Sequence, residues 1–193
     1  MSDSTNEILM RIEKLKLKVG AGAALLVLLL APQTHGQQQM LSKDELIAAA
    51  REIMTSARYC ALITTDSRGR VHTRAMDPFP PEADMTVWFG TNSRSRKVRE
   101  IRRNPRVTLY YFDRENQEYV VISGIARLVN DPNEKIKRWK DEWKSFYPNR
   151  ATDYLLIEFR PEKLEVISEK KKIFGDPHTW KPPTVTFIRN AKK

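Results

Sequence analysis

Residues 74–106 read RAMDPFPPEADMTVWFGTNSRSRKVREIRRNPR, a pattern that predicts a strand, a turn and a helix in succession. The apolar segment Met85–Gly90 has the composition of a strand and leads into Thr91-Asn92. A short run with two serines follows. The basic amphipathic segment Arg96–Arg103 comes next and is stopped by Asn104-Pro105. Basic side chains therefore stand at the start of a predicted helix, directly after a hydroxyl-rich turn.

This combination of turn and helix start is suited to binding a phosphate. Backbone N–H groups at a helix N-terminus point outward and carry partial positive charge. Arg96 and Lys97 add full positive charges, while Thr91, Ser93 and Ser95 offer hydroxyl donors. A basic helix is more often only a solvated face, and that alternative stays open for these residues.

Several short motifs, taken in order, resemble the pyridoxamine 5′-phosphate oxidase-like family of FMN-binding split barrels, most closely its general stress protein 26-like branch. The motifs are Arg74-Ala75-Met76, Trp88-Phe89-Gly90-Thr91-Asn92, Ser95-Arg96-Lys97-Val98, Asn104-Pro105-Arg106-Val107 and Ser123-Gly124-Ile125-Ala126-Arg127-Leu128. The resemblance covers residues 44–187. It implies a mainly β fold, an FMN-binding split barrel of about six antiparallel strands with peripheral helices.

The resemblance also implies a cofactor site. The residues that match the family's flavin contacts are Arg74, Ala75, Met76, Gly90, Thr91, Ser95, Arg96, Lys97 and Trp180. Arg74 would face the pyrimidine edge of the flavin and its phosphate, and Ser95-Arg96-Lys97 would hold the phosphate dianion. Trp180 would cover the ring from a second subunit. Because relatives use other cofactors, a deazaflavin, FAD or haem stays open beside FMN.

The same resemblance implies a homodimer with the cofactor at its interface. The family's C-terminal substrate segment of Arg-Leu-x-Pro type is absent, and a glutamine of the pyridoxamine-phosphate oxidases is replaced near Tyr119. We therefore expect a flavin-dependent oxidoreductase of the stress-protein kind, acting on a small molecule that the sequence does not identify. The alternatives are a flavin-binding protein without turnover and, less favoured, a basic nucleic-acid-binding module.

Composition agrees with a soluble globular domain. The chain has 193 residues, of which 40% are hydrophobic and 30% charged, and its net charge is +10. Such a charge fits nucleic acid, an anionic surface or an anionic cofactor. Aromatic residues are not interleaved with the basic residues of 94–103, as a stacking platform for nucleic acid would require. The single cysteine, Cys60, lies in an apolar strand pattern and is predicted to be a small buried hydrophobe.

The N-terminal residues 1–36 have the plan of a secretory signal. Lysines and Arg11 precede an apolar run over Val19–Ala31, and Thr34 and Gly36 supply small residues before a cleavage site after Gly36. We expect an exported protein, periplasmic or secreted, whose translation starts at Met1 or Met10. There are two alternatives. In one, the leader stays uncleaved and anchors the protein, which is the one membrane contact that we expect; in the other, residues 1–36 form a buried N-terminal helix. Residues 40–193 would form the split-barrel domain.

The rest of the chain predicts short turns between antiparallel strands. A helix begins at Ser42 with a capping box to Glu45, and hairpins form over 59–77 and 107–129, with a bulge or a close backbone approach at Gly124. A helix is expected from Asp131 to about Phe146, and two last strands over 153–160 and 164–168. The three histidines are scattered, so we expect no metal site, and the sequence assigns no catalytic residue.

Overall fold

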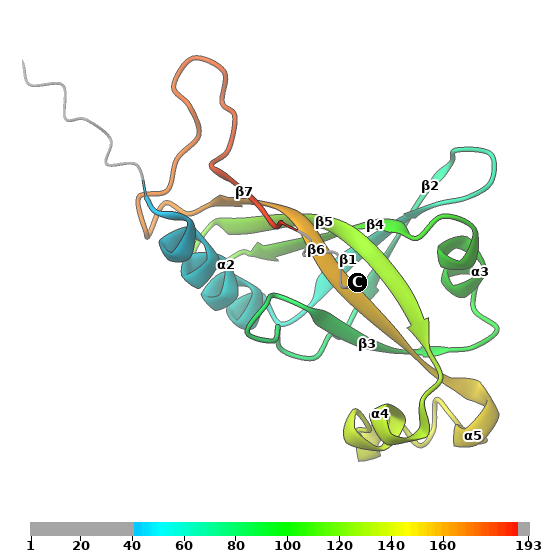
Figure 1. Ribbon diagram of the computed structural model, residues 1–193. Coiled ribbons are helices and arrows are strands. Elements are labelled where there is room, and N and C mark those ends of the chain that lie inside the picture. The colour runs from blue at the N-terminus through cyan, green and yellow to red at the C-terminus, as the bar shows by residue number, and fades with distance from the viewer. Residues whose placement is uncertain (1–40, 189–193) are drawn as a thin grey trace, which may run out of the picture. The chain divides into compact units, whose positions relative to one another are not determined.

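Figure 1 shows the protein as a computed structural model that describes residues 41–188. The expected leader, its cleavage site and the choice between Met1 and Met10 lie outside these residues. No helix within 41–188 is long and apolar enough to cross a bilayer.

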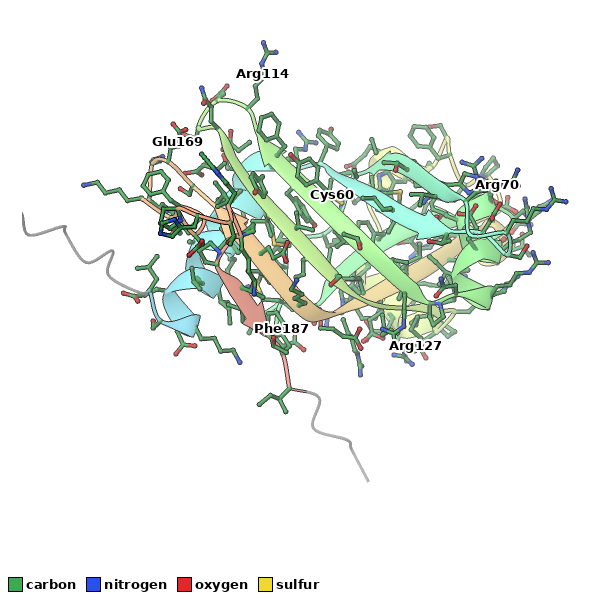
Figure 2. The ribbon with its side chains drawn as sticks, turned by 90° about the horizontal axis from the view of Figure 1, so that it is seen from above. Cys60, Arg70, Arg114, Arg127, Glu169 and Phe187 are labelled. Carbon is green, nitrogen blue, oxygen red and sulfur yellow. The ribbon has the colours of Figure 1, made fainter. Side chains whose placement is uncertain are left out.

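Seven antiparallel strands form one sheet in the order β2-β1-β4-β5-β6-β3, with β7 paired to β6. Their bounds are β1 (Cys60–Thr65), β2 (Val71–Met76), β3 (Val87–Asn92), β4 (Arg106–Asp113), β5 (Glu118–Val129), β6 (Tyr154–Ile167) and β7 (Thr184–Thr186). The two hairpins expected over 59–77 and 107–129 are confirmed. Their turns, which carry Arg70 and Arg114, project from opposite ends of the sheet (Figure 2).

The sheet curls until its two edge strands approach each other. Pro78, just after β2, forms a bridge with Phe89 of β3, and the backbone N–H of Phe79 donates to Trp88 O at 2.8 Å. Inward side chains of the strands form the main core, in which Leu62, Leu109 and Phe159 have no exposed surface. Closing a sheet in this way leaves few unpaired strand edges.

Two helices lie at opposite ends of the sheet (Figure 1). Helix α2 (Lys43–Ala57) begins with the predicted capping box: Ser42 Oγ accepts from the Glu45 N–H at 3.3 Å, and Glu45 Oε2 accepts from the Ser42 N–H at 2.7 Å. Helix α3 (Arg96–Arg103) follows the turn after β3, and it buries Val98 and Ile101. The two helices thus bury their apolar stripes against the sheet.

The predicted turn at residues 161–163 does not exist, because β6 runs unbroken from Tyr154 to Ile167. The pairing of β5 with β6 instead shifts register between Ser123 and Gly124, where Pro161 lies opposite Gly124. A Cβ on Gly124 would stand 2.0 Å from the carbonyl oxygen of Arg160. The expected bulge and close backbone approach at Gly124 are therefore confirmed. The bulge accommodates Pro161 within β6, so that the strand continues where a turn was predicted.

The helix predicted from Asp131 to Phe146 is much shorter. It starts where expected, with Asp131 as its cap and Pro132 as its first residue, but α4 (Pro132–Lys137) ends at Lys137. The 3₁₀ turn η2 (Asp141–Trp143) and α5 (Arg150–Asp153) follow it. Aromatic packing explains the break. The rings of Trp139, Trp143, Tyr147 and Tyr154 meet one another at centroid distances of 5.0–6.5 Å, which a single straight helix could not bring about.

Candidate functional site

The candidate site is a buried charge cluster where the edge strand β2 meets helix α3. Side chains alternate along β2, so His72 and Arg74 point to the same face of the strand. Glu100, on the second turn of α3, lies 4% exposed between them. Its Oε1 is 2.6 Å from His72 Nδ1, and its Oε2 accepts from Arg74 Nη2 at 3.0 Å and from the Thr64 hydroxyl at 2.6 Å.

The guanidinium of Arg74 is fixed by three hydrogen bonds. Besides Glu100, it donates through Nη1 to Leu62 O at 3.0 Å and to Thr64 Oγ1 at 2.6 Å. A guanidinium has five N–H donors, so two remain for a ligand. Burial lowers the pKa of Arg74, and the Glu100 carboxylate opposes that shift. Arg74 is therefore a positioned cation rather than a mobile surface residue.

Arg96 and Lys97 bring two more positive charges to this cluster. Arg96 Nε lies 3.4 Å from Glu100 Oε1, one helical turn away. Lys97 is partly buried, and its ammonium makes no hydrogen bond or salt bridge with any residue of 41–188. Burial lowers the pKa of Lys97, and the nearby Arg74 lowers it further. A desolvated cation beside another cation is costly unless an anion joins them.

The start of α3 offers further donors. Within the described chain, the backbone N–H groups of Arg96 and Lys97 have no acceptor, and the N-cap residue Ser95 makes no capping bond through its side chain. The hydroxyls of Ser95 and Thr91 lie 3.3 Å apart. Arg94 is engaged elsewhere, because it pairs with Asp153 at 2.8 Å. The start of α3 thus carries hydroxyls and free N–H groups, and the cations Arg74, Arg96 and Lys97 are near enough to influence one another electrostatically, a combination that suits an anion.

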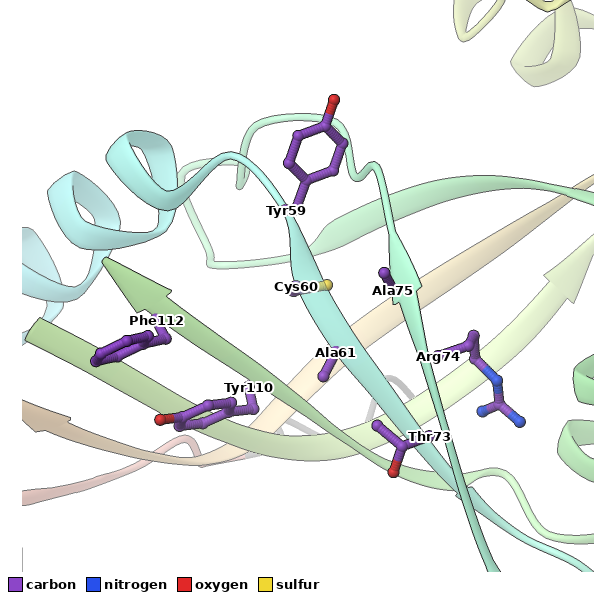
Figure 3. Close-up of a pocket in the computed structure, with 8 residues that line it drawn as sticks. All are labelled: Tyr59, Cys60, Ala61, Thr73, Arg74, Ala75, Tyr110 and Phe112. Atoms are coloured by element: carbon purple, nitrogen blue, oxygen red, sulfur yellow. The ribbon is translucent and has the colours of Figure 1, made fainter. Parts of the chain in front are cut away.

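Ala75 and Met76 lie on opposite faces of β2. Met76 is buried in the main core, whereas Ala75 is exposed and lines a shallow hollow. The hollow is lined by Tyr59, Cys60, Ala61, Thr73, Arg74, Ala75, Tyr110 and Phe112. Figure 3 shows the Tyr110 and Phe112 rings on one side of it and the Arg74 side chain directed away from them. Arg74 thus borders both the hollow and the charge cluster.

Gly90 lies under the aromatic cluster. A Cβ at this position would stand 2.4 Å from Cζ3 of Trp143 and 2.8 Å from Cε2 of Tyr154. Trp88, on the same face of β3, is also buried, and the guanidinium of Arg138 lies 3.7 Å from its ring centre. Phe89 points to the main core. The side-chain face of Gly90 is therefore filled by the chain itself, and only its backbone is open to another contact.

Trp180 is far from the charge cluster within one chain. It is 84% exposed, with φ at +58°, in the segment between Ile173 and β7. Asp176 orders this segment: its carbonyl accepts from the Trp180 N–H at 2.7 Å, and its carboxylate accepts from the Thr179 N–H at 2.8 Å. Figure 1 shows the segment before β7 at the opposite end of the sheet from α3. Trp180 therefore does not join Arg74 inside a single subunit.

Comparison with known proteins gives the chain its family. A family model described as "Pyridoxamine 5'-phosphate oxidase like" matches residues 45–174. This chain belongs to the pyridoxamine 5′-phosphate oxidase-like family. No protein with a curated description matches the sequence. The short motifs around Arg74 and Ser95 thus predicted the family correctly.

Solved structures of the family share the fold. A protein related to general stress protein 26 from Clostridium acetobutylicum is 21% identical, with a TM-score of 0.60; the match covers 76% of this chain and 96% of that one. General Stress Protein 26 from Bacillus anthracis is also 21% identical, with a TM-score of 0.56 over 75% and 98% of the two chains. A pyridoxamine 5′-phosphate oxidase-related, FMN binding protein from Nostoc punctiforme is 15% identical, with a TM-score of 0.56 over 79% and 100%. The predicted mainly β split barrel is confirmed.

Sequence reasoning missed three members of the cluster, which are Thr64, His72 and Glu100. The alternation along β2 did place His72 on the face of Arg74. Glu100 stands four residues after Arg96, a spacing that puts the two side chains on one side of a helix. Its contacts with β1 and β2 depend on how α3 packs, and the sequence of this family member contains no signal for that packing.

Proposed function

We propose that this protein binds FMN through the cations at the start of α3 and acts as a flavin-dependent oxidoreductase. The observation that carries the proposal is Lys97, a partly buried ammonium without a hydrogen-bonding partner in residues 41–188, beside the fixed guanidinium of Arg74. These residues fit a phosphate monoester, which needs several cations and N–H donors at one place. Family membership supports a flavin as the group attached to it.

Each residue would have a separate part in holding the cofactor. Arg74, Arg96 and Lys97 would bind the phosphate together with the free backbone N–H groups of α3. Arg74 would also present a positive charge toward the ring, where it would stabilise negative charge on the reduced flavin. Two-electron transfer between small molecules is the chemistry that a flavin supplies, and the chain's task is to orient it.

We further propose a homodimer that completes the site. The sheet face formed by β2, β1 and β4 exposes Tyr59 at 52%, Val71 at 64%, Tyr110 at 37% and Phe112 at 50%. Several large exposed apolar side chains on one sheet face favour an interface there. Because the hollow lined by Tyr59, Tyr110 and Phe112 borders Arg74, a subunit packed there would reach the cofactor. The exposed Trp180 is then available to cover the flavin of the partner subunit.

The test is to purify the protein, add FMN and remove what does not bind. We expect a yellow protein with an absorption band at about 450 nm, because the chromophore belongs to the bound cofactor. The bleaching of that band by NADH or NADPH separates an oxidoreductase from a flavin-binding protein without turnover. A colourless protein that takes up no FMN contradicts the proposal.

Light scattering, which measures the mass of the particle in solution, tests the dimer by comparing the wild type with Phe112→Asp.

Export through the leader at residues 1–36 is a proposal on the sequence pattern alone. Fractionation of cells that make the full chain tests it. We expect the protein outside the cytoplasm and shortened by the leader, whereas full-length protein in the cytoplasmic fraction contradicts it.

A further inference from the structure

The Glu100 carboxylate is a negative charge buried among the cations of the candidate site. It is 4% exposed and contacts residues from three elements, namely Thr64 of β1, His72 and Arg74 of β2, and Arg96 of its own helix. A buried carboxylate is tolerated only when cations and hydrogen-bond donors compensate it. Its pKa is lowered: burial alone would raise it, and the hydrogen bonds from Thr64 and His72 outweigh that effect. The carboxylate is therefore negatively charged in the ligand-free protein.

The same cations would also hold a ligand phosphate. Arg74 and Arg96 contact Glu100 directly, and Lys97 is close enough to both Arg74 and Glu100 for its pKa to respond to each. The three cations and one carboxylate give the cluster a net charge of 3 − 1 = +2 with His72 neutral. A phosphate bound there stands near Glu100, and two negative groups that share cations repel each other.

We propose that Glu100 is a resident counter-ion, which stabilises the ligand-free protein and at the same time weakens its affinity for a phosphate-bearing ligand. Without Glu100, Arg74, Arg96 and Lys97 would repel one another across the junction of β2 and α3. With Glu100, part of their charge is already neutralised before the ligand arrives. This inference rests on the proposed function, because it takes the phosphate of FMN as the ligand group.

Glu100→Gln is the variant that separates these effects. Glutamine keeps the shape and a side-chain oxygen that can accept from Arg74 and Thr64, so the guanidinium stays in position while the charge is removed. The measurements are the melting temperature of the apoprotein and the dissociation constants for FMN and riboflavin, from quenching of flavin fluorescence. Riboflavin lacks the phosphate and reports on the ring site alone. Glu115→Gln, an exposed residue in the β4–β5 turn, is the matched control.

We expect Glu100→Gln to melt at a lower temperature than the wild type and to bind FMN about 5- to 10-fold more tightly, because a repelling charge is gone. The riboflavin constant should be unchanged, and Glu115→Gln should resemble the wild type throughout. An unchanged or weaker FMN affinity would overturn the proposal, and so would an equal gain for riboflavin or an undiminished melting temperature.

Inorganic phosphate keeps the test independent of flavin. We expect it to raise the melting temperature of Glu100→Gln more than that of the wild type, since the anion replaces the missing charge. If the variant folds only in phosphate buffer, the proposal is supported; if phosphate neither restores its fold nor stabilises it more than the wild type, the proposal fails. A wild type that binds no FMN contradicts the proposed function, while the phosphate comparison still decides the role of Glu100.

Discussion

The guanidinium of Arg74 and the carboxylate of Glu100 form an ion pair, with 3.0 Å between Nη2 and Oε2, that joins the edge strand β2 to helix α3. Arg74 is 18% exposed in its side chain and Glu100 5%, so the pair is shielded from water. This ion pair connects the two parts of the charge cluster, because Arg74 belongs to β2 whereas Arg96 and Lys97 belong to α3. The contacts of Glu100 with Thr64 and His72 hold the same junction together with this ion pair.

Arg74→Lys should weaken FMN binding more than it weakens the fold. Lysine keeps the charge but loses the fork that donates to Leu62 O, Thr64 and Glu100 at once. Charge-assisted hydrogen bonds contribute about 1.5–3 kcal/mol each, so we expect a loss of roughly 10-fold or more in FMN affinity. Flavin fluorescence titration measures it, with Arg70→Lys in the exposed β1–β2 turn as the control. An FMN affinity equal to that of the control would contradict the assigned position of Arg74.

Gly124→Ala should destabilise the protein more than Gly90→Ala. The new Cβ at residue 124 meets the backbone oxygen of Arg160 at 2.0 Å, which cannot move without disturbing β6. At residue 90 it meets side-chain atoms of Trp143 and Tyr154, which can shift. Overpacking costs about 1–3 kcal/mol and more when backbone is displaced. Urea unfolding measures both, and Trp143→Leu should partly rescue Gly90→Ala but leave Gly124→Ala unchanged.

Cys60 should not react with thiol reagents in the folded protein. The residue is 3% exposed, near the middle of the sheet (Figure 2). Burial raises the pKa of its thiol to about 12; the nearby Tyr111 hydroxyl opposes the shift and Asp77 adds to it. The reactive thiolate is therefore scarce at neutral pH. We expect modification by a chromogenic disulfide reagent only after denaturation; rapid labelling of the native protein at pH near 8 would show that this strand is open.

Stability should fall at strongly acid pH through Asp113. Hydrogen bonds from the Ser56 hydroxyl and the Asn116 amide lower the pKa of this carboxyl to about 2. A carboxyl with a lowered pKa in the folded state stabilises the fold above its unfolded value, near 3.9, and loses that contribution as pH falls toward its folded value. The difference in unfolding free energy between the wild type and Asp113→Asn should thus shrink between pH of about 5 and 2. A difference that stays constant over this range would contradict the assignment.

Short stretches of sequence predicted those helix starts and turns that depend on contacts between neighbouring residues. The capping box of Ser42 and Glu45 and the hairpin around Gly69, with its φ of +76°, follow from residues close in sequence. The bulge at Gly124 could be predicted because a glycine interrupts a strand pattern, although the strand opposite it, β6, is distant in sequence. The break after α4 and the continuity of β6 could not be predicted. They depend on aromatic rings that meet from separate segments and on a proline accommodated by a glycine of another strand.

The candidate site divides in the same way. The cations Arg74, Arg96 and Lys97 stand out in the sequence because the family motif and the charge pattern mark them. The buried carboxylate of Glu100, which contacts Arg74 and Arg96, could not be predicted. In the sequence Glu100 is one more charged residue of a basic helix, and only the packing of α3 against β1 and β2 brings it to Thr64 and His72. Long-range packing therefore decides which charges are positioned and which are only solvated.

The most direct measurement is a fluorescence titration of FMN and riboflavin against the wild type, the double variant Arg96→Ala/Lys97→Ala and the control Arg102→Ala/Arg103→Ala. The control residues are exposed in the last turn of the same helix, away from its N-terminus. We expect the site variant to lose FMN affinity by at least about 100-fold, from two charge-assisted contacts, while riboflavin binding and the melting temperature of the apoprotein stay as in the control. A site variant that binds FMN as tightly as the control would contradict the phosphate site at the start of α3.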